Sequence, residues 1–408
     1  MAEHQRLQAQ IRRRRGPARA DARSRLRPGG LRPLRHVRVK LPHCCLAVLF
    51  ESLATAGVLQ RARSVGGRTR VLFLTDGENN PWAQRAVERR WRLSPADRLR
   101  WGSRRRAEAV TALSCLGLDK ECARFLGYPD QGLFDLLMTE PEPLINDLVQ
   151  ELTGFEPSIL IEPHPADRHP DHGALGVLTT SALARASLDG LEPVRLHYLV
   201  HDARRPARHS MPITLRLTES ELERKRRAIL THRTQLPLRG RSLLRFAAAQ
   251  EPFLPLVGSG IRDQGHAIRM CRIRRGRLVL TLGKTGWPSL GRRNIAIAIQ
   301  TEHGAMERWR VDVPGATGPV PILTGSTQEP LAEGFGQVLR TRIQLVLPLP
   351  SSLRPAAMYV KVDCPSLRRL GFFDPVGWRT VPVSALPSAT LGSQIPRRLH
   401  AVPSSDGA

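Results

Sequence analysis

The chain has 408 residues, 41% hydrophobic residues and a formal net charge of +27. This length allows at least one packed core, as in an ordinary globular protein. No stretch approaches the roughly 20 apolar residues of a membrane span, and the start lacks the apolar run and cleavage site of a signal peptide. The cysteines show neither CxxC pairs nor secreted-domain spacing, so we expect free thiols and a cytoplasmic location.

The positive charge is concentrated at the N-terminus. Residues 1–40 carry +11 of the +27, because twelve Arg and one Lys face only Glu3 and Asp21. Like charges with Gly and Pro oppose a packed core, so we predict a disordered Arg-rich tail. No zinc finger or RNP-type aromatic cluster accompanies the Arg residues, and specific nucleic-acid binding needs base contacts. We expect no specific nucleic-acid partner and keep a basic, nucleic-acid-associated protein as an alternative.

Between residues 41 and 255, short apolar runs alternate with helical patterns. Residues 71–74 and 157–161 are typical of buried strands. Helical spacing is found at 105–116, which Gly117 closes, and helices are also expected at 173–184 and 219–231. This alternation predicts a Rossmann-like α/β domain with a mostly parallel sheet and helices on both faces.

The pattern changes after about residue 260. β-type runs at 277–282, 294–299, 344–347 and 358–362 are separated by Gly and Pro turns, without a long helical pattern. This predicts a C-terminal antiparallel, β-sandwich-like domain. The expected organisation is a tail at 1–40, an α/β domain at 41–255, a β-rich accessory domain at 262–384 and a loose, Ser/Pro-rich tail at 385–408.

A polar loop follows the strand predicted at 157–161. It reads Asp167-Arg168-His169-Pro170-Asp171-His172. Two imidazoles three positions apart, with a carboxylate between them, can form a metal or acid–base site. A turn after a buried strand is where an open α/β sheet places such a site.

Six pieces of the sequence, in order and with compatible spacing, resemble the LmbE-like (PIG-L) de-N-acetylase family. The resemblance, over the stretch that these pieces span, covers about half of the chain. The pieces are Glu51-Ser52-Leu53-Ala54-Thr55 with Gly57; Thr75-Asp76-Gly77-Glu78; Arg105 with Glu108; Leu126-Gly127-Tyr128-Pro129-Asp130; His169-Pro170-Asp171-His172; and Lys225, Ala228, His232 and Gln235.

The resemblance implies an α/β fold holding a divalent metal, usually zinc, that removes the N-acetyl group from an amino sugar or glycoconjugate. Such a metal polarises the amide carbonyl and lowers the pKa of bound water. By the same resemblance, His172 is a metal ligand, and His169 faces the oxyanion with Asp171 holding its tautomer. The residues expected to contact the sugar substrate are Arg105, Asp130 and Glu78.

The sequence departs from the family just before Glu51. There the family has a His-Pro-Asp-Asp stretch that supplies a His ligand, an Asp ligand and the Asp base. The equivalent positions here are Ala47-Val48-Leu49-Phe50, which offer no metal ligand and no base. A rival register aligns Pro42-His43 instead, with Cys45 at the base position. We therefore expect weak zinc binding or none, with His43 as the possible substitute ligand.

Three hypotheses follow for the function. The protein is a metal-dependent de-N-acetylase with a site rebuilt around His43 or a cysteine, or it is an inactive relative that binds a sugar. Alternatively, a displaced reading frame or start has altered the N-terminal segment, which an intact-mass measurement of the native protein tests.

Overall fold

The computed structural model describes residues 44–49, 54–201, 213–254, 266–284, 292–302, 304–369 and 373–383. The predicted tails at 1–40 and 385–408 lie outside these residues, as does the boundary predicted between 255 and 262. Among the helices described, none is both long enough and apolar enough to span a bilayer.

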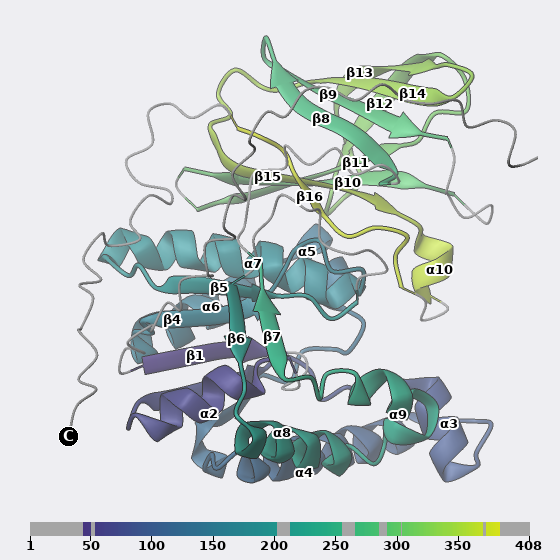
Figure 1. Ribbon diagram of the computed structural model, residues 1–408. Coiled ribbons are helices and arrows are strands. Elements are labelled where there is room, and N and C mark those ends of the chain that lie inside the picture. The colour runs from purple at the N-terminus through teal and green to yellow at the C-terminus, as the bar shows by residue number, and fades with distance from the viewer. Residues whose placement is uncertain are drawn as a thin grey trace, which may run out of the picture. The chain divides into compact units, whose positions relative to one another are not determined.

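Five parallel strands form the sheet of the N-terminal α/β region, in the order β3-β2-β1-β4-β5 (Figure 1). After β1 the chain adds β2 and β3 towards one edge, then returns to place β4 and β5 on the other side of β1. The carboxyl ends of β1 and β4 therefore meet where the strand order reverses, and open α/β sheets bind ligands at that point. The strands are β1 (Cys44–Leu49), β2 (Arg68–Phe73), β3 (Ala123–Phe125), β4 (Ile159–Pro163) and β5 (Val194–Tyr198).

Helices cover both faces of this sheet. Successive side chains of a strand point to opposite faces, so Val71 and Phe73 pack with α2, α4 and α8, whereas Leu72 and Leu74 pack with α5, α6 and α7 (Figure 1). The predicted α/β class with a parallel sheet is thus confirmed. The helices are α2 (Ala56–Ser64), α3 (Pro81–Glu88), α4 (Pro95–Cys115), α5 (Leu133–Thr139), α6 (Glu142–Phe155), α7 (Pro170–Ala186), α8 (Glu219–Thr231) and α9 (Leu236–Leu244).

Helix α4 begins ten residues before the predicted start at 105. Ser94 caps it, because its hydroxyl accepts from the Asp97 amide while the Asp97 carboxylate accepts from the Ser94 amide. Pro95 follows at the first helical position, where its missing N–H costs nothing. The prediction relied on apolar spacing and missed this capping box.

The C-terminal region is one nine-stranded antiparallel sheet in the order β16-β15-β10-β11-β12-β13-β14-β9-β8. A two-stranded antiparallel sheet, β6 (Ile213–Arg216) with β7 (Gln250–Phe253), flanks α8 and α9 in sequence. The nine strands are β8 (Ile268–Arg274), β9 (Arg277–Gly283), β10 (Asn294–Thr301), β11 (Met306–Asp312), β12 (Gly318–Thr324), β13 (Pro330–Val338), β14 (Arg342–Pro348), β15 (Pro355–Asp363) and β16 (Arg379–Thr380).

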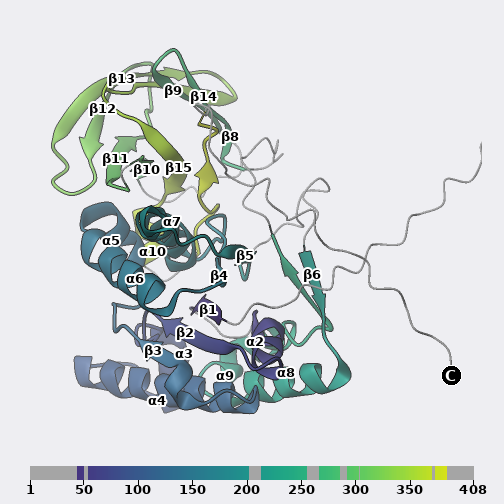
Figure 2. The same cartoon turned by 90° about the vertical axis from the view of Figure 1, so that its left-hand side faces the viewer.

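The sheet curls into a nearly closed barrel rather than the predicted sandwich of two sheets (Figure 2). At the seam, the Arg379 guanidinium of β16 donates to the Ile268 carbonyl of β8. Apolar side chains from all the long strands fill the interior. Alternation along each strand shows which residues point inward, but it cannot tell two facing sheets from one curled sheet, so the sequence left this undecided.

Strand β10 is buried on both faces. Ile295, Ile297 and Ile299 point into the barrel, whereas Ala296 and Ala298 join the cluster built on α5, α6 and α7. The small alanines let the helices approach the sheet closely. The barrel and the α/β region therefore share an apolar core on this face.

Candidate active site

The polar loop predicted from the sequence follows β4 and runs into the first turn of α7. Residues 164–172 are here called the His loop. Strand β4 is fully buried, and α7 begins at Pro170 with His169 as its N-cap. Proline at the first helical position and a capping side chain before it explain why the helix begins there. The loop thus lies at the carboxyl edge of the parallel sheet, as predicted.

His172 lies buried in the first turn of α7, where its Nδ1 is 3.3 Å from Oδ2 of Asp167. The same carboxylate oxygen accepts from the amides of Val200 and His201. Burial alone would raise the pKa of Asp167, but the charge and hydrogen bond of His172 outweigh it and hold that pKa well below its usual range. An ionised Asp167 makes Nδ1 of His172 the donor and leaves the lone pair on Nε2, which is how metal-binding histidines are oriented.

His169 is suited to a neutral state. Its Nδ1 accepts from the Asp171 amide at 3.3 Å, which puts the ring proton on Nε2. Burial, with the neighbouring His172 and His201, lowers the pKa of His169 well below its ordinary value. A neutral imidazole with Nε2–H can donate a hydrogen bond to a carbonyl oxygen, the role that the resemblance implies.

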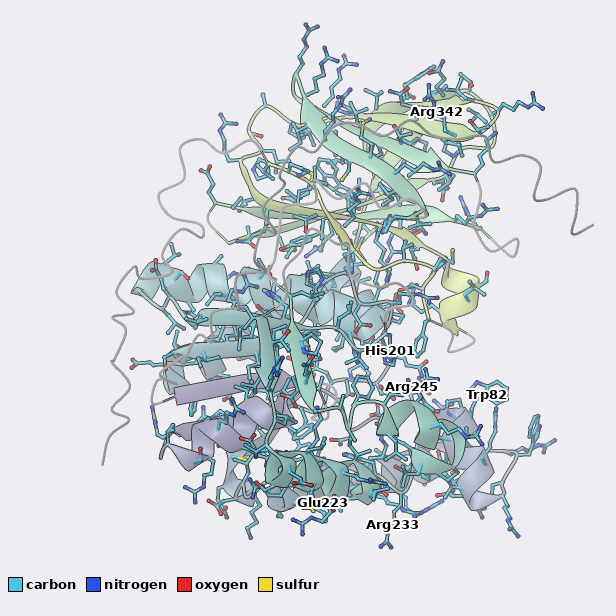
Figure 3. All side chains as sticks on the ribbon, viewed as in Figure 1. Trp82, His201, Glu223, Arg233, Arg245 and Arg342 are labelled. Atoms are coloured by element: carbon cyan, nitrogen blue, oxygen red, sulfur yellow. The ribbon has the colours of Figure 1, made fainter. Side chains whose placement is uncertain are left out.

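A third imidazole and an aromatic ring complete this cluster, and both were missed in the sequence. His201 follows β5, and its ring centroid lies 5.2 Å from His172 and 5.6 Å from His169. Phe373 stacks on His201 at 4.4 Å. Figure 3 shows His201 on the same side of the α/β region as Arg245 and Trp82. No local motif marks His201 or Phe373, because each reaches the cluster only through the fold.

The predicted sugar-contact residues also come together. Glu78 Oε1 accepts from the Asp130 amide at 2.8 Å, and the positive charge of Arg105 acts on the Asp130 carboxylate. Arg105 Nη1 donates to the Gly77 carbonyl at 2.7 Å. Glycine suits this position, because φ is +67°, which strains an L side chain, and a Cβ would lie 1.9 Å from that guanidinium and displace it.

Asp171 links this group to the imidazoles. It is fully buried, and its Oδ1 accepts from the Leu133 amide at 3.1 Å, whereas Oδ2 has no hydrogen-bond partner among the described residues. Burial, and then the nearby Asp130, raises the pKa of Asp171 to about 7. Burial raises the pKa of Asp130 to about 6. The positive charge of Arg105 opposes this rise, and the negative charge of Glu78 adds to it. Two coupled carboxyls near neutral pH can exchange a proton with a ligand.

The zinc that the resemblance implies does not fit the residues present. His172 is oriented as a ligand, but the described residues contain no group of three or more His, Cys, Asp or Glu side chains that could hold a metal ion. The stretch where the family has two further ligands and the base reads Ala47-Val48-Leu49-Phe50, and its side chains carry no donor atom.

The proposed substitute, His43, lies outside the described residues. Its neighbour Cys44 begins β1 opposite Arg68, the first residue of β2, at the amino edge of the sheet. A strand rises about 3.3 Å per residue, so the six residues of β1 separate its ends by roughly 17 Å. His172 follows the carboxyl end of β4, so the backbone favours the register that aligns Ala47-Val48-Leu49-Phe50 with the missing motif.

Imidazoles and carboxylates thus gather at the switch point of the parallel sheet, where open α/β proteins bind ligands. The family model of GlcNAc-PI de-N-acetylase (PIG-L) matches residues 51–183 of this chain. The resemblance drawn from six sequence pieces is thereby confirmed.

Relatives of known structure or function match only part of the chain. The 1D-myo-inositol 2-acetamido-2-deoxy-alpha-D-glucopyranoside deacetylase of Nocardia farcinica is 30% identical over 172 residues, which are 38% of this chain and 54% of that protein. The chain thus spans about half the length of this curated relative. A conserved protein from Thermus thermophilus is 22% identical with a TM-score of 0.39, covering 55% of this chain and 99% of its own. The N,N'-diacetylchitobiose deacetylase from Pyrococcus horikoshii is 18% identical with a TM-score of 0.39, covering 52% and 82%.

Proposed function

We propose that the α/β region binds an N-acetylated amino sugar or glycoconjugate, and that zinc-dependent hydrolysis is impaired in this chain. Glu78, Arg105 and Asp130 hold the sugar, and the neutral His169 donates to the acetyl carbonyl. The observation that carries this proposal is the contrast within one site. The sugar-contact and imidazole groups are assembled, whereas the segment before Glu51 supplies no ligand and no base.

Isothermal titration of the full chain with N-acetylglucosamine conjugates tests the binding. Arg105→Ala should weaken binding at least tenfold, because it removes a half-buried cation beside Asp130. Arg98→Ala, an exposed arginine on the same helix, is the matched control and should bind as the parent does. Equal affinities for both variants and the parent would sink the proposed sugar site.

A second candidate function is metal-dependent de-N-acetylation, for which Nε2 of His172 would be one ligand. The orientation of His172 by Asp167 and the neutral state of His169 favour it. Elemental analysis of the purified protein, combined with an amine-release assay on the same conjugates, separates the two candidates. Stoichiometric zinc, with turnover abolished by His172→Ala, would establish the enzyme and overturn the impaired-hydrolysis proposal.

A further inference from the structure

Residues 373–378, which follow α10 (Pro365–Arg369) in sequence and precede β16, lie against the His loop. The Asp374 amide donates to the Arg168 carbonyl at 2.9 Å, and Arg168 Nε donates back to the Asp374 carbonyl at 2.9 Å. The Trp378 amide donates to the Pro165 carbonyl at 2.9 Å. Residues 373–378, here called the barrel strap, are therefore bonded along the loop that carries His169 and His172.

The contact between the strap and the loop is tight. A Cβ on Gly377 would lie 2.2 Å from the carbonyl carbon of Ala166, so glycine is required for the two backbones to approach this closely. The indole of Trp378 is buried and packs against Gly173, where a Cβ would lie 3.0 Å from its ring. The strap cannot shift without moving the loop.

A buried ion pair fixes the strap from its other side. The Asp374 carboxylate pairs with Lys361 of β15, and both side chains are almost fully buried. The Lys361 ammonium lies 4.3 Å from the ring centroid of Phe134 in α5. The preceding residue, Leu133, donates its amide to Asp171, so the strap and Asp171 are held by one connected set of contacts.

Phe373 begins the strap and lies against the imidazoles. Its ring stacks on His201 at 4.4 Å and lies 5.5 Å from His169, and the Arg239 guanidinium of α9 is 5.6 Å from its centroid. The side chain is nevertheless 37% exposed. Phe373 lies far outside residues 51–183, so the barrel, and not the family domain, contributes this aromatic group.

The His loop separates two kinds of contact. On one side Asp171 adjoins Asp130, and with it Glu78 and Arg105. On the other side His169 adjoins Phe373 and Arg239. A ligand held by its sugar on the carboxylate side would extend past His169 towards an aromatic ring and a cation.

We propose that Phe373 is a specificity-determining residue that contacts the group attached to the amino sugar. The ligand class is an N-acetylated amino sugar bearing an aromatic or apolar aglycone, bound in preference to the free sugar. An aromatic ring offers such a group an apolar surface and offset stacking, for which free sugar has no counterpart. This inference rests on the sugar-binding function proposed above.

The test compares two probes, benzyl N-acetylglucosaminide and free N-acetylglucosamine, by isothermal titration of the full chain. We expect the benzyl conjugate to bind roughly 3- to 10-fold more tightly, which corresponds to one aromatic contact. Phe373→Ala should abolish this preference and leave the affinity for the free sugar unchanged. Phe373→Tyr should keep the preference.

The matched control is Phe335→Ala, which removes a phenylalanine of the same barrel that is 50% exposed on β13 and should leave both affinities unchanged. Circular dichroism and urea unfolding establish that each variant is folded. If both probes bind the parent chain equally, or if Phe373→Ala weakens both by the same factor, the inference is overturned while the sugar site stands. If neither probe binds the parent chain, the proposed function fails and this inference with it.

Discussion

The two regions of the molecule bury charge in different ways. The carboxyl edge of the α/β sheet buries Glu162, Asp167, Asp171 and His172 within a few residues of one another in sequence. The barrel interior, as far as it is described, is packed with apolar side chains, and its buried Lys361–Asp374 pair lies where the barrel meets α5. Buried charge costs free energy unless it is paired, so its location distinguishes a surface built for packing from one built for binding or chemistry.

The largest expected effect comes from breaking a buried ion pair in each region. Lys225→Met leaves Glu251 buried without its partner 2.6 Å away, and Lys361→Met does the same to Asp374. Each should lower the free energy of unfolding by about 3–5 kcal/mol in urea titrations. Only Lys361→Met should shift the imidazole NMR signals of His169 and His172, because only that pair holds the barrel strap.

A compensated double variant, Lys225→Met with Glu251→Gln, is the control and should recover part of the loss because no unpaired charge remains. Equal imidazole shifts in both single variants would contradict the distinction between the two pairs.

The pH dependence of stability should reflect the α/β site. The folded pKa of Asp130 is about 6, above its ordinary value of 3.8, because burial and Glu78 oppose ionisation. Protonation therefore favours the folded state. The stabilising contribution of protonated Asp130 to the free energy of unfolding is fully present below about pH 4. It is lost as the pH rises through 6, a change on the order of 2–3 kcal/mol.

Asp130→Asn should flatten the fall in the free energy of unfolding between about pH 4 and pH 6, since the amide does not ionise. It should also remove the charge that helps to raise the pKa of Asp171. Urea unfolding at several pH values measures this, with the exposed Asp119→Asn as the control. An unchanged slope in Asp130→Asn would refute the assigned pKa.

Gly377→Ala should cost about 1–3 kcal/mol, because the new methyl group meets the Ala166 backbone. The matched change Gly315→Ala, in the same region, places its Cβ in open space and should be close to neutral. Thermal and urea unfolding compare the two. A neutral Gly377→Ala would show that the strap and the His loop are not in close contact.

The smallest effect concerns the start of α4. Ser94→Ala removes the hydroxyl that accepts from the Asp97 amide and should cost about 1 kcal/mol. Ser94→Asp keeps an N-cap acceptor but places it beside Asp97, so it should recover only part of the loss. An unchanged free energy of unfolding in Ser94→Ala would show that this cap does not stabilise the first turn of α4, and that the stable part of the helix begins nearer to the predicted residue 105.

Local sequence patterns predicted most of the helices and strands, and they predicted the part of the candidate site that lies within residues 51–183. The predicted helix at 219–231 matches α8, because Thr218 and Glu221 form a capping box at its start. The His loop was placed at the end of a buried strand, and the structure has it after β4. The roles assigned to His169, Asp171, His172, Arg105, Asp130 and Glu78 stay predictions, although the structure brings these residues together.

The sequence by itself determined the α/β class, the resemblance of residues 51–183 to the de-N-acetylase family, and the absence of donor side chains at Ala47-Val48-Leu49-Phe50. Periodicity, motif order and residue chemistry are local properties, so the sequence carries them directly. Only the tertiary structure decided that the barrel is a single curled sheet and that Phe373 and His201 lie beside His169. Contacts between distant segments depend on how strands and helices pack. The alternation of side chains along a strand shows which side is buried, but not which other segment packs against it.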